Sequence, residues 1–283
     1  MPDGSYEKGG AAPRGSDSPL SAAVAERDRN VIAMVQDALD RRDVVLAFQP
    51  VVQSMENGRI AFYEGLIRVI DRSGRTIPAG DFIETVETTE LGRMLDCTAL
   101  ELGLAALADC PDLRLAINMS ARSIGYPRWT RTLNRAIEDD ATLAERLILE
   151  ITESSAMVMP DLVTVFMRDL QAKGIAFALD DFGAGYTAIR YLRDFYFDIL
   201  KIDGQFIRGI ADDPDNQVLT SALIAIAQHF DMFTVAENVE TARDAAWLAS
   251  AGIDCMQGYA FGAPTIVPPW RSGTGDPGER RSA

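Results

Sequence analysis

Histidine and cysteine are scarce in this chain of 283 residues. His229 is the only histidine, and it lies in the apolar stretch SALIAIAQHF, which favours a structural role. A single histidine cannot supply an HExxH zinc site, and it leaves little room for a Ser-His-Asp triad. The three cysteines, Cys97, Cys110 and Cys255, are scattered without CxxC spacing. We therefore expect reduced thiols in a cytoplasmic protein.

Long apolar runs and excess positive charge are also missing. No stretch reaches the roughly 18 apolar residues of a membrane helix, so we expect no membrane span. The N-terminal segment has no apolar core of the kind that a secretory signal needs. The chain has 27 basic and 42 acidic residues, a net charge of −15. This charge repels polyanions and argues against bulk binding of nucleic acid or anionic membranes.

Composition divides the chain into a central domain with two tails. Residues 1–20 are rich in Gly, Pro, Ser and Ala and are predicted to be a disordered N-terminal tail. Residues 21–42 have the pattern of a leading helix, and residues 43–266 contain no Pro/Gly/Ser-rich linker. We therefore predict one domain there, followed by a disordered C-terminal tail over residues 267–283.

Short β-rich runs alternate with longer amphipathic segments along this domain. The expected strands cover residues 46–52, 60–69, 113–119, 147–152, 175–181, 198–203, 233–238 and 255–259. The expected helices cover residues 89–108, 128–139, 160–173, 213–230 and 241–251. From the third run onward, this alternation is typical of parallel strands joined by right-handed crossovers.

About eight strands in one domain predict an α/β fold, a modified TIM-type (β/α)8 barrel. The first two runs are separated only by SMENGR, and its Asn57-Gly58 pair favours a tight hairpin. We therefore expect the first strand pair to be antiparallel. A doubly wound open sheet is the structural alternative.

Polar side chains recur in the expected strands, where nearly every apolar run ends in, or contains, a carboxylate, amide or lysine. They are Glu64, Asn118, Glu150, Asp180 with Asp181, Lys201, Glu237 and Gln257. The carboxyl ends of barrel strands meet on one face, so these side chains should line one pocket. Each alone has a structural explanation, such as a salt bridge or, for Asp180-Asp181 before Gly183, a turn. Together they are harder to explain, because burying an unpaired carboxylate costs several kcal/mol.

Metal ions would allow so many acids to coexist. The cluster offers carboxylate and amide oxygens without histidine or thiolate, which favours Mg²⁺ or Mn²⁺. Asp180 and Asp181 point to opposite faces of a regular strand, so we expect the strand to end there. Asp181 could then bridge toward a second ion, ~3.5–4 Å from the first. Lys201 shares a face with Asp203; it either stabilises charge developing on phosphate or forms a buried ion pair with Asp203. These residues predict metal-assisted hydrolysis of a phosphoester and do not name the substrate.

Eight motifs carry a resemblance to a known family. They are FQPVV (48–52), YEGLIR (63–68), NMS (118–120), EITES (150–154), DDFGAGY (180–186), KID (201–203), AENVET (236–241) and MQGYAFGAP (256–264). In this order and spacing the chain resembles the EAL domain family of bacterial cyclic di-GMP phosphodiesterases over residues 40–264. The resemblance implies hydrolysis of cyclic di-GMP to linear pGpG with two Mg²⁺ or Mn²⁺ ions.

The resemblance also implies roles for individual residues. The matching metal ligands are Glu64, Asn118, Glu150, Asp180, Asp181 and Glu237. The matching catalytic residues are Lys201, beside the nucleophilic water, with Glu237 and Glu64. The matching pocket and substrate contacts are Gln49, Arg68 and Gln257. Glu153 matches a residue that braces loop 182–187, and Asp203 and Glu240 resemble supporting residues. Glu240 could instead belong only to the start of the following helix.

Three positions depart from the family pattern: Gly65 stands for alanine, Ala184 for threonine and Asn238 for glycine. A glycine with φ > 0 would be replaced most mildly by asparagine, though with added bulk beside Glu237. The alternative function is a non-catalytic EAL receptor that binds cyclic di-GMP and acts through a protein partner; a pure interaction scaffold is a third. The family also suggests a homodimer.

Overall fold

The computed structural model describes residues 18–55, 58–183, 192–193 and 195–271. Within these residues one nine-stranded sheet has the order β1-β9-β8-β7-β6-β5-β4-β2-β3, and a β1–β2 pairing closes it. The strands are β1 (Val44–Gln53), β2 (Ile60–Ile70), β3 (Thr76–Pro78), β4 (Leu115–Asn118), β5 (Leu147–Thr152), β6 (Ala176–Phe182), β7 (Ile199–Ile202), β8 (Phe233–Ala236) and β9 (Cys255–Gln257). Eight strands therefore form a closed barrel, and β3 extends β2 outside it.

Strand direction follows the sequence pattern. β1 runs antiparallel to both β2 and β9, whereas the pairs from β2–β4 round to β8–β9 are parallel. Gly58, in the predicted hairpin turn, has φ +77°, a conformation that glycine adopts readily. The predicted barrel and its antiparallel first pair are confirmed, and the doubly wound open sheet is wrong.

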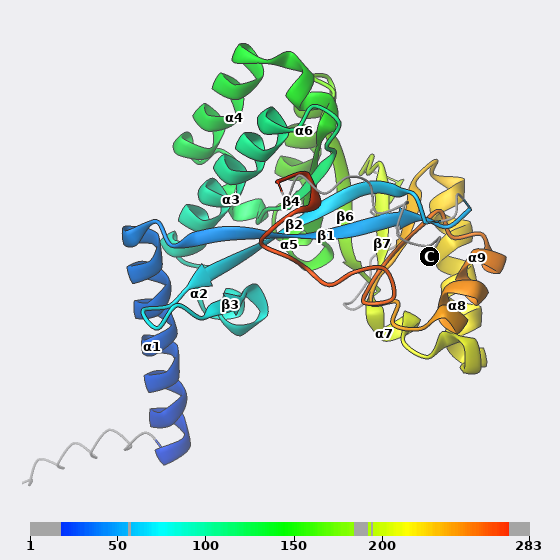
Figure 1. Ribbon diagram of the computed structural model, residues 1–283, viewed down its shortest axis with the longest axis horizontal. Coiled ribbons are helices and arrows are strands. Elements are labelled where there is room, and N and C mark those ends of the chain that lie inside the picture. The colour runs from blue at the N-terminus through cyan, green and yellow to red at the C-terminus, as the bar shows by residue number, and fades with distance from the viewer. Residues whose placement is uncertain (1–17, 56–57, 184–191, 194, 272–283) are drawn as a thin grey trace, which may run out of the picture.

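The helices flank the barrel (Figure 1). They are α1 (Pro19–Arg41), α2 (Ile83–Val86), α3 (Glu90–Asp109), α4 (Pro127–Asp139), α5 (Glu153–Val158), α6 (Pro160–Gln171), α7 (Gly204–Ile207), α8 (Pro214–His229) and α9 (Ala242–Ala251). Side-chain oxygens of Thr89, Asp213 and Thr241 accept hydrogen bonds from the first turns of α3, α8 and α9. These caps explain why these three helices begin close to their predicted starts. No helix of the described residues is long and apolar enough to span a membrane.

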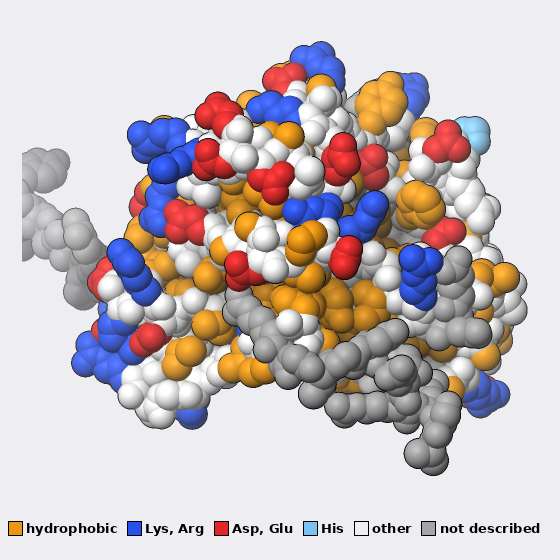
Figure 2. Space-filling view, turned by 45° about the horizontal axis from the view of Figure 1, so that its top comes forward, with side chains coloured by type: hydrophobic (Ala, Val, Ile, Leu, Met, Phe, Trp, Pro, Cys, Tyr) orange, Lys and Arg blue, Asp and Glu red, His pale blue; other side chains and the backbone are white. Residues whose placement is uncertain are grey.

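One apolar layer fills the barrel interior with a single residue from each of the eight barrel strands. The layer consists of Val51, Phe62, Ala116, Ile148, Ala178, Ile199, Val235 and Cys255. A larger cluster, which includes Trp129 and Phe177, packs the helices against the outside of the sheet. Acidic and basic side chains are interspersed on the face shown in Figure 2.

The C-terminal segment packs on the barrel beyond its predicted boundary. The predicted tail begins at residue 267, but Pro269–Arg271 forms a 3-10 turn. The Trp270 ring makes edge contacts with Phe48 and Tyr63, with centroids 5.0 Å and 4.9 Å away. This segment crosses β1 and β2 in Figure 1, and Thr265 forms a β-bridge with Phe48. The described part of the predicted tail is therefore ordered through aromatic packing.

Candidate metal and phosphodiester site

A polar layer lies directly beside the apolar layer. Side chains two residues apart on a strand share a face. The residue two positions from each member of the apolar layer, toward one end of the barrel, is polar on all eight strands. The polar layer consists of Gln49, Glu64, Asn118, Glu150, Asp180, Lys201, Glu237 and Gln257. The structure thus brings together seven strand-end residues predicted from position and Gln49, which the family resemblance suggested.

Lys201 occupies the centre of this layer and is 1% exposed. Its Nζ lies 2.8 Å from carboxylate oxygens of Glu150, Asp180 and Glu237, and 3.3 Å from Glu64 Oε2. No ion pair with Asp203 occurs among the described residues. The predicted alternative, a buried Lys201–Asp203 pair, is therefore wrong: four carboxylates from four other strands share the ammonium.

Amide side chains orient Glu64. Asn118 Nδ2 donates to Glu64 Oε1 at 2.8 Å, and Gln257 Nε2 donates to Glu64 Oε2 at 2.6 Å. Gln257 Nε2 also lies 3.2 Å from Gln49 Oε1, and Gln49 Nε2 donates to the Gly262 carbonyl. Each Glu64 oxygen therefore has a fixed direction, because one is held by an amide from β4 and the other by an amide from β9.

Burial and charge shift the ionisation of the cluster in different directions. Burial opposes the charge of Lys201, but Asp180, Glu150, Glu237 and Glu64 raise its pKa well above the usual value. Burial and neighbouring acids raise the pKa values of Glu150 and Glu237 well above normal. For Glu64, burial is outweighed by Lys201 and the amide donors, and its pKa is lowered. The single ammonium therefore only partly offsets the burial and mutual repulsion of these acids.

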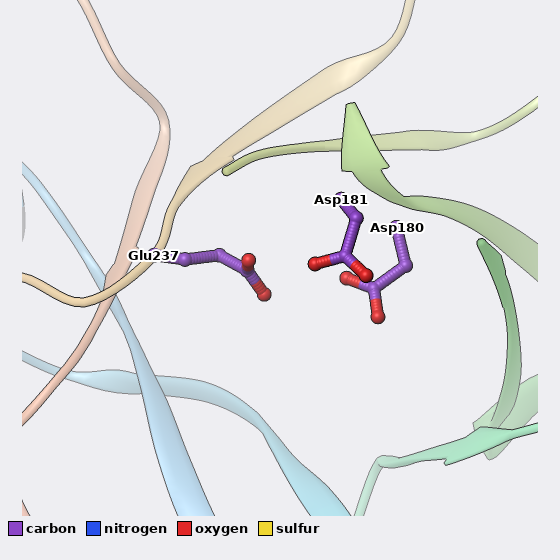
Figure 3. A group of neighbouring side chains, drawn as sticks. All are labelled: Asp180, Asp181 and Glu237. Atoms are coloured by element: carbon purple, nitrogen blue, oxygen red, sulfur yellow. The ribbon is translucent and has the colours of Figure 1, made fainter. Parts of the chain in front are cut away.

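Asp180 and Asp181 reach the same space through a bulge. The predicted strand end is wrong, because β6 continues to Phe182. Leu179 pairs with Leu200 and Phe182 with Ile202, so β6 has one extra residue opposite β7, and Asp181 has φ +55°. Carboxylate oxygens of Asp180, Asp181 and Glu237 lie within 4.8 Å of one another and point together in Figure 3. Burial and then Asp180 raise the pKa of Asp181 to about 6.

The donor set fits hard divalent cations. The polar layer offers carboxylate and amide oxygens, which Mg²⁺ and Mn²⁺ prefer. Within the part of the chain that the structure describes, Glu150 Oε1 and Gln257 Oε1 are buried and accept no hydrogen bond. Buried acceptors without donors are costly unless a cation or water binds them. The cluster thus has both the ligands and the unsatisfied acceptors that a cation site needs.

Comparison with known proteins places this chain in a family. The family model described as EAL domain matches residues 32–264. The chain belongs to the EAL domain family. It is 31% identical over 247 residues to the bifunctional diguanylate cyclase/cyclic di-GMP phosphodiesterase MucR of Pseudomonas aeruginosa, a match that covers 86% of this chain and 36% of MucR. It is 30% identical over 234 residues to the cyclic di-GMP phosphodiesterase PdeF of Escherichia coli, covering 81% of this chain and 31% of PdeF.

Solved EAL structures share the fold. The PaMucR phosphodiesterase in a c-di-GMP complex has a TM-score of 0.72 and 31% identity, covering 83% of this chain and 97% of that chain. The FimX EAL domain from Pseudomonas aeruginosa bound to c-di-GMP has a TM-score of 0.76 and 25% identity, covering 84% of this chain and 97% of that chain. The chain spans about a third of the length of these curated relatives.

Four further predicted residues of this EAL domain lie around the polar layer. Glu153 Oε2 accepts a hydrogen bond from the Gly183 N–H at 3.2 Å, at the start of the loop that it was predicted to brace. Asp203 caps α7 by accepting from Gln205 N at 2.7 Å. Arg68, partly buried, donates to the Ile67 carbonyl, and burial lowers its pKa.

The fourth, Glu240, is exposed, and its Oε1 lies 3.8 Å from Arg208 Nε. Thr241 caps α9 with Asp244, directly after Glu240, so the helix-start alternative for Glu240 also stays open. Its supporting role stays a prediction, because an exposed ion pair of this kind contributes little.

The family departures that the structure describes have packing explanations. A Cβ on Gly65 would lie 2.7 Å from Ile117 Cδ1, so isoleucine fills the space of the usual alanine. Asn238 has φ +53°, as the predicted replacement of a glycine requires. A Cβ on Gly204 would lie 2.7 Å from Asn238 Cγ, so the asparagine side chain packs against this glycine. Ala184 and most of loop 182–187 lie outside the described residues.

Proposed function

We propose that this EAL domain hydrolyses one phosphodiester of cyclic di-GMP to linear pGpG with two Mg²⁺ or Mn²⁺ ions. The carrying observation is the charge of the site. Among the described residues, Lys201 is the one ammonium beside Glu64, Glu150, Asp180 and Glu237, and Asp181 adds a fifth carboxylate. With every group ionised, five carboxylates and one ammonium carry a net charge of −4, which two divalent ions would balance. The named activities of MucR and PdeF support the substrate.

Different residues of the polar layer would have different roles in this reaction. Glu64, Asn118, Glu150, Asp180, Asp181 and Glu237 would hold the ions. When bound, the ions would withdraw charge from the phosphate and acidify a water molecule. Water adds to phosphorus, the bond from phosphorus to the 3′ oxygen breaks, and the proton lost by water is balanced by the proton gained at that oxygen.

Lys201 serves this reaction best as a fixed cation. Its raised pKa keeps it protonated while the acids surround it, so it would stabilise the charge that develops on phosphate. Glu237, whose Oε1 lies 2.8 Å from Lys201 Nζ, would then accept the proton of water. Arg68 lies on β2, the strand that carries Glu64, and would bind the substrate phosphate. Gln49 pairs with Glu64 from β1 and would make a polar contact to the substrate.

The test is a turnover assay on the purified chain. Cyclic di-GMP is incubated with Mg²⁺ or Mn²⁺, and products are separated by chromatography, with Glu64→Ala as the matched control. Formation of pGpG by the wild type and its loss in the variant would support the proposal. Tight cyclic di-GMP binding without product in either metal would favour the receptor alternative instead. The homodimer and the cytoplasmic location belong to the same proposal; the three unpaired cysteines agree with a reducing compartment.

A further inference from the structure

Asp96 on α3 holds the loop that follows β4. The backbone N–H of Ser120 donates to Asp96 Oδ2 at 3.0 Å, and the Ser123 hydroxyl donates to the same oxygen at 2.5 Å. Ser123 is fully buried. One carboxylate oxygen therefore fixes both ends of a four-residue segment that begins two residues after Asn118.

The same segment is tied to the strand that carries Glu150. Ala121 N–H donates to Ser155 Oγ at 2.8 Å, and Met119 N–H donates to the Glu150 carbonyl at 2.9 Å. The Ser155 N–H donates in turn to Thr152 Oγ1. The loop after β4 is thus held between α3 on one side and β5 with α5 on the other, with Asn118 and Glu150 at its borders.

Asp96 acts as a hydrogen-bond acceptor rather than as an ion-pair partner. Among the described residues no arginine or lysine forms an ion pair with it. Burial raises its pKa to about 7, although the Ser123 and Ser120 hydrogen bonds oppose that shift. An amide oxygen at this position could accept the same two bonds, so asparagine should replace it with small loss.

We propose that Asp96 is a positioning residue that fixes the loop after β4 and so aims Asn118 at Glu64 and a bound cation. This inference rests on the proposed function for the cation. Asn118 Nδ2 already donates to Glu64 Oε1, which leaves its amide oxygen as the ligand atom. Loss of the Asp96 bonds frees the backbone next to Asn118, and the amide no longer has one orientation.

Asp254 provides a matched control. It precedes β9, away from the polar layer, and it accepts from Thr234 N–H at 2.8 Å and from Thr234 Oγ1 at 2.7 Å. The donor types equal those at Asp96, one backbone N–H and one hydroxyl. Asp254→Ala should therefore disturb folding to a similar degree and leave the polar layer intact.

The experiment compares Asp96→Ala, Asp96→Asn and Asp254→Ala in the full chain. Mn²⁺ affinity is measured by calorimetry, and amide hydrogen exchange is followed over residues 119–123. We expect Asp96→Ala to weaken Mn²⁺ binding about 10- to 100-fold and to speed exchange in this segment. Asp96→Asn should restore affinity to within about threefold, and Asp254→Ala should leave it unchanged.

Two results for Asp96→Ala alone would overturn the inference. One is a folded Asp96→Ala variant with wild-type Mn²⁺ affinity; the other is unchanged exchange over residues 119–123. A wild type that binds no Mn²⁺ would instead count against the proposed function, and the exchange measurement would still decide whether Asp96 holds the loop. A loss of affinity equal in Asp96→Ala and Asp254→Ala would show a general effect on folding and reject positioning.

Discussion

The apolar and polar layers of the barrel are built from the same eight strands, two residues apart. They nevertheless have opposite effects on the stability of the fold. The apolar layer removes side chains such as Ile199 and Phe62 from water and so stabilises the fold. The polar layer buries Glu150 and Lys201, at 0% and 1% exposure, and leaves acceptors such as Glu150 Oε1 unsatisfied. A site that costs stability in this way indicates selection for chemistry rather than for folding.

The largest expected effect comes from making the polar layer apolar at its centre. Lys201→Met removes the cation that four carboxylates share, and turnover should fall about 10²–10³-fold. Its control is Ile199→Ala, two residues away on β7, which should cost about 2–5 kcal/mol of stability. That control should keep turnover per folded molecule within about threefold. Steady-state kinetics and denaturant unfolding of both variants compare their effects on turnover and on stability. Equal losses of turnover in the two variants would contradict the assignment of separate roles to the two layers.

Protonation should weaken metal binding at low pH. The pKa of Asp181 is raised to about 6, and the pKa values of Glu150 and Glu237 are also raised well above normal, so protons compete with cations as pH falls. Mn²⁺ affinity should drop by up to about tenfold per pH unit below about pH 6 for each proton displaced. Calorimetric titrations between about pH 5 and 8 test this. An affinity independent of pH would mean that these acids do not bind the ion.

Most of the polar layer could be predicted from sequence because its residues interrupt or end apolar strand runs, which periodicity reveals. Glu64, Glu150 and Lys201 each end or follow an apolar run. The bulge at Asp181 could not be predicted, because it depends on the pairing of β6 with β7. Asp96 was missed because an acid on a helix normally faces water. Its signal was present, since it follows buried Gly92 by four residues and precedes buried Ala99 by three.

Glu150→Gln tests how much the polar layer destabilises the metal-free fold. Burial and Glu64 raise the pKa of Glu150 above its unfolded value, so ionisation at neutral pH works against the metal-free fold. The uncharged amide removes the free-energy cost of ionising a buried carboxyl group. That cost is absent below the unfolded-state pKa of Glu150 and grows as pH rises above it. We expect the metal-free variant to gain about 0.5–2 kcal/mol in unfolding free energy and to lose turnover. A variant less stable than the wild type at neutral pH without metal would contradict this reading.

The most local effect concerns the contact between Gly204 and Asn238. Gly204→Ala places a methyl group against the Asn238 side chain and should cost about 1–3 kcal/mol. In an Asn238→Gly background most of this cost should vanish, and a double-mutant cycle by thermal unfolding measures the coupling. Additive costs would show that the two side chains do not compete for space. The same series tests whether Asn238→Gly raises turnover, as crowding beside Glu237 predicts.

The most direct test counts cations and product in the same samples. Mn²⁺ is titrated into the wild type with cyclic di-GMP present, bound Mn²⁺ is followed by electron paramagnetic resonance, and pGpG is followed by chromatography. We predict that two ions bind per chain, that product formation follows the second ion, and that EDTA abolishes it. Formation of pGpG at the same rate in EDTA, or unchanged Mn²⁺ binding in an Asp180→Asn, Glu237→Gln double variant, would contradict the account.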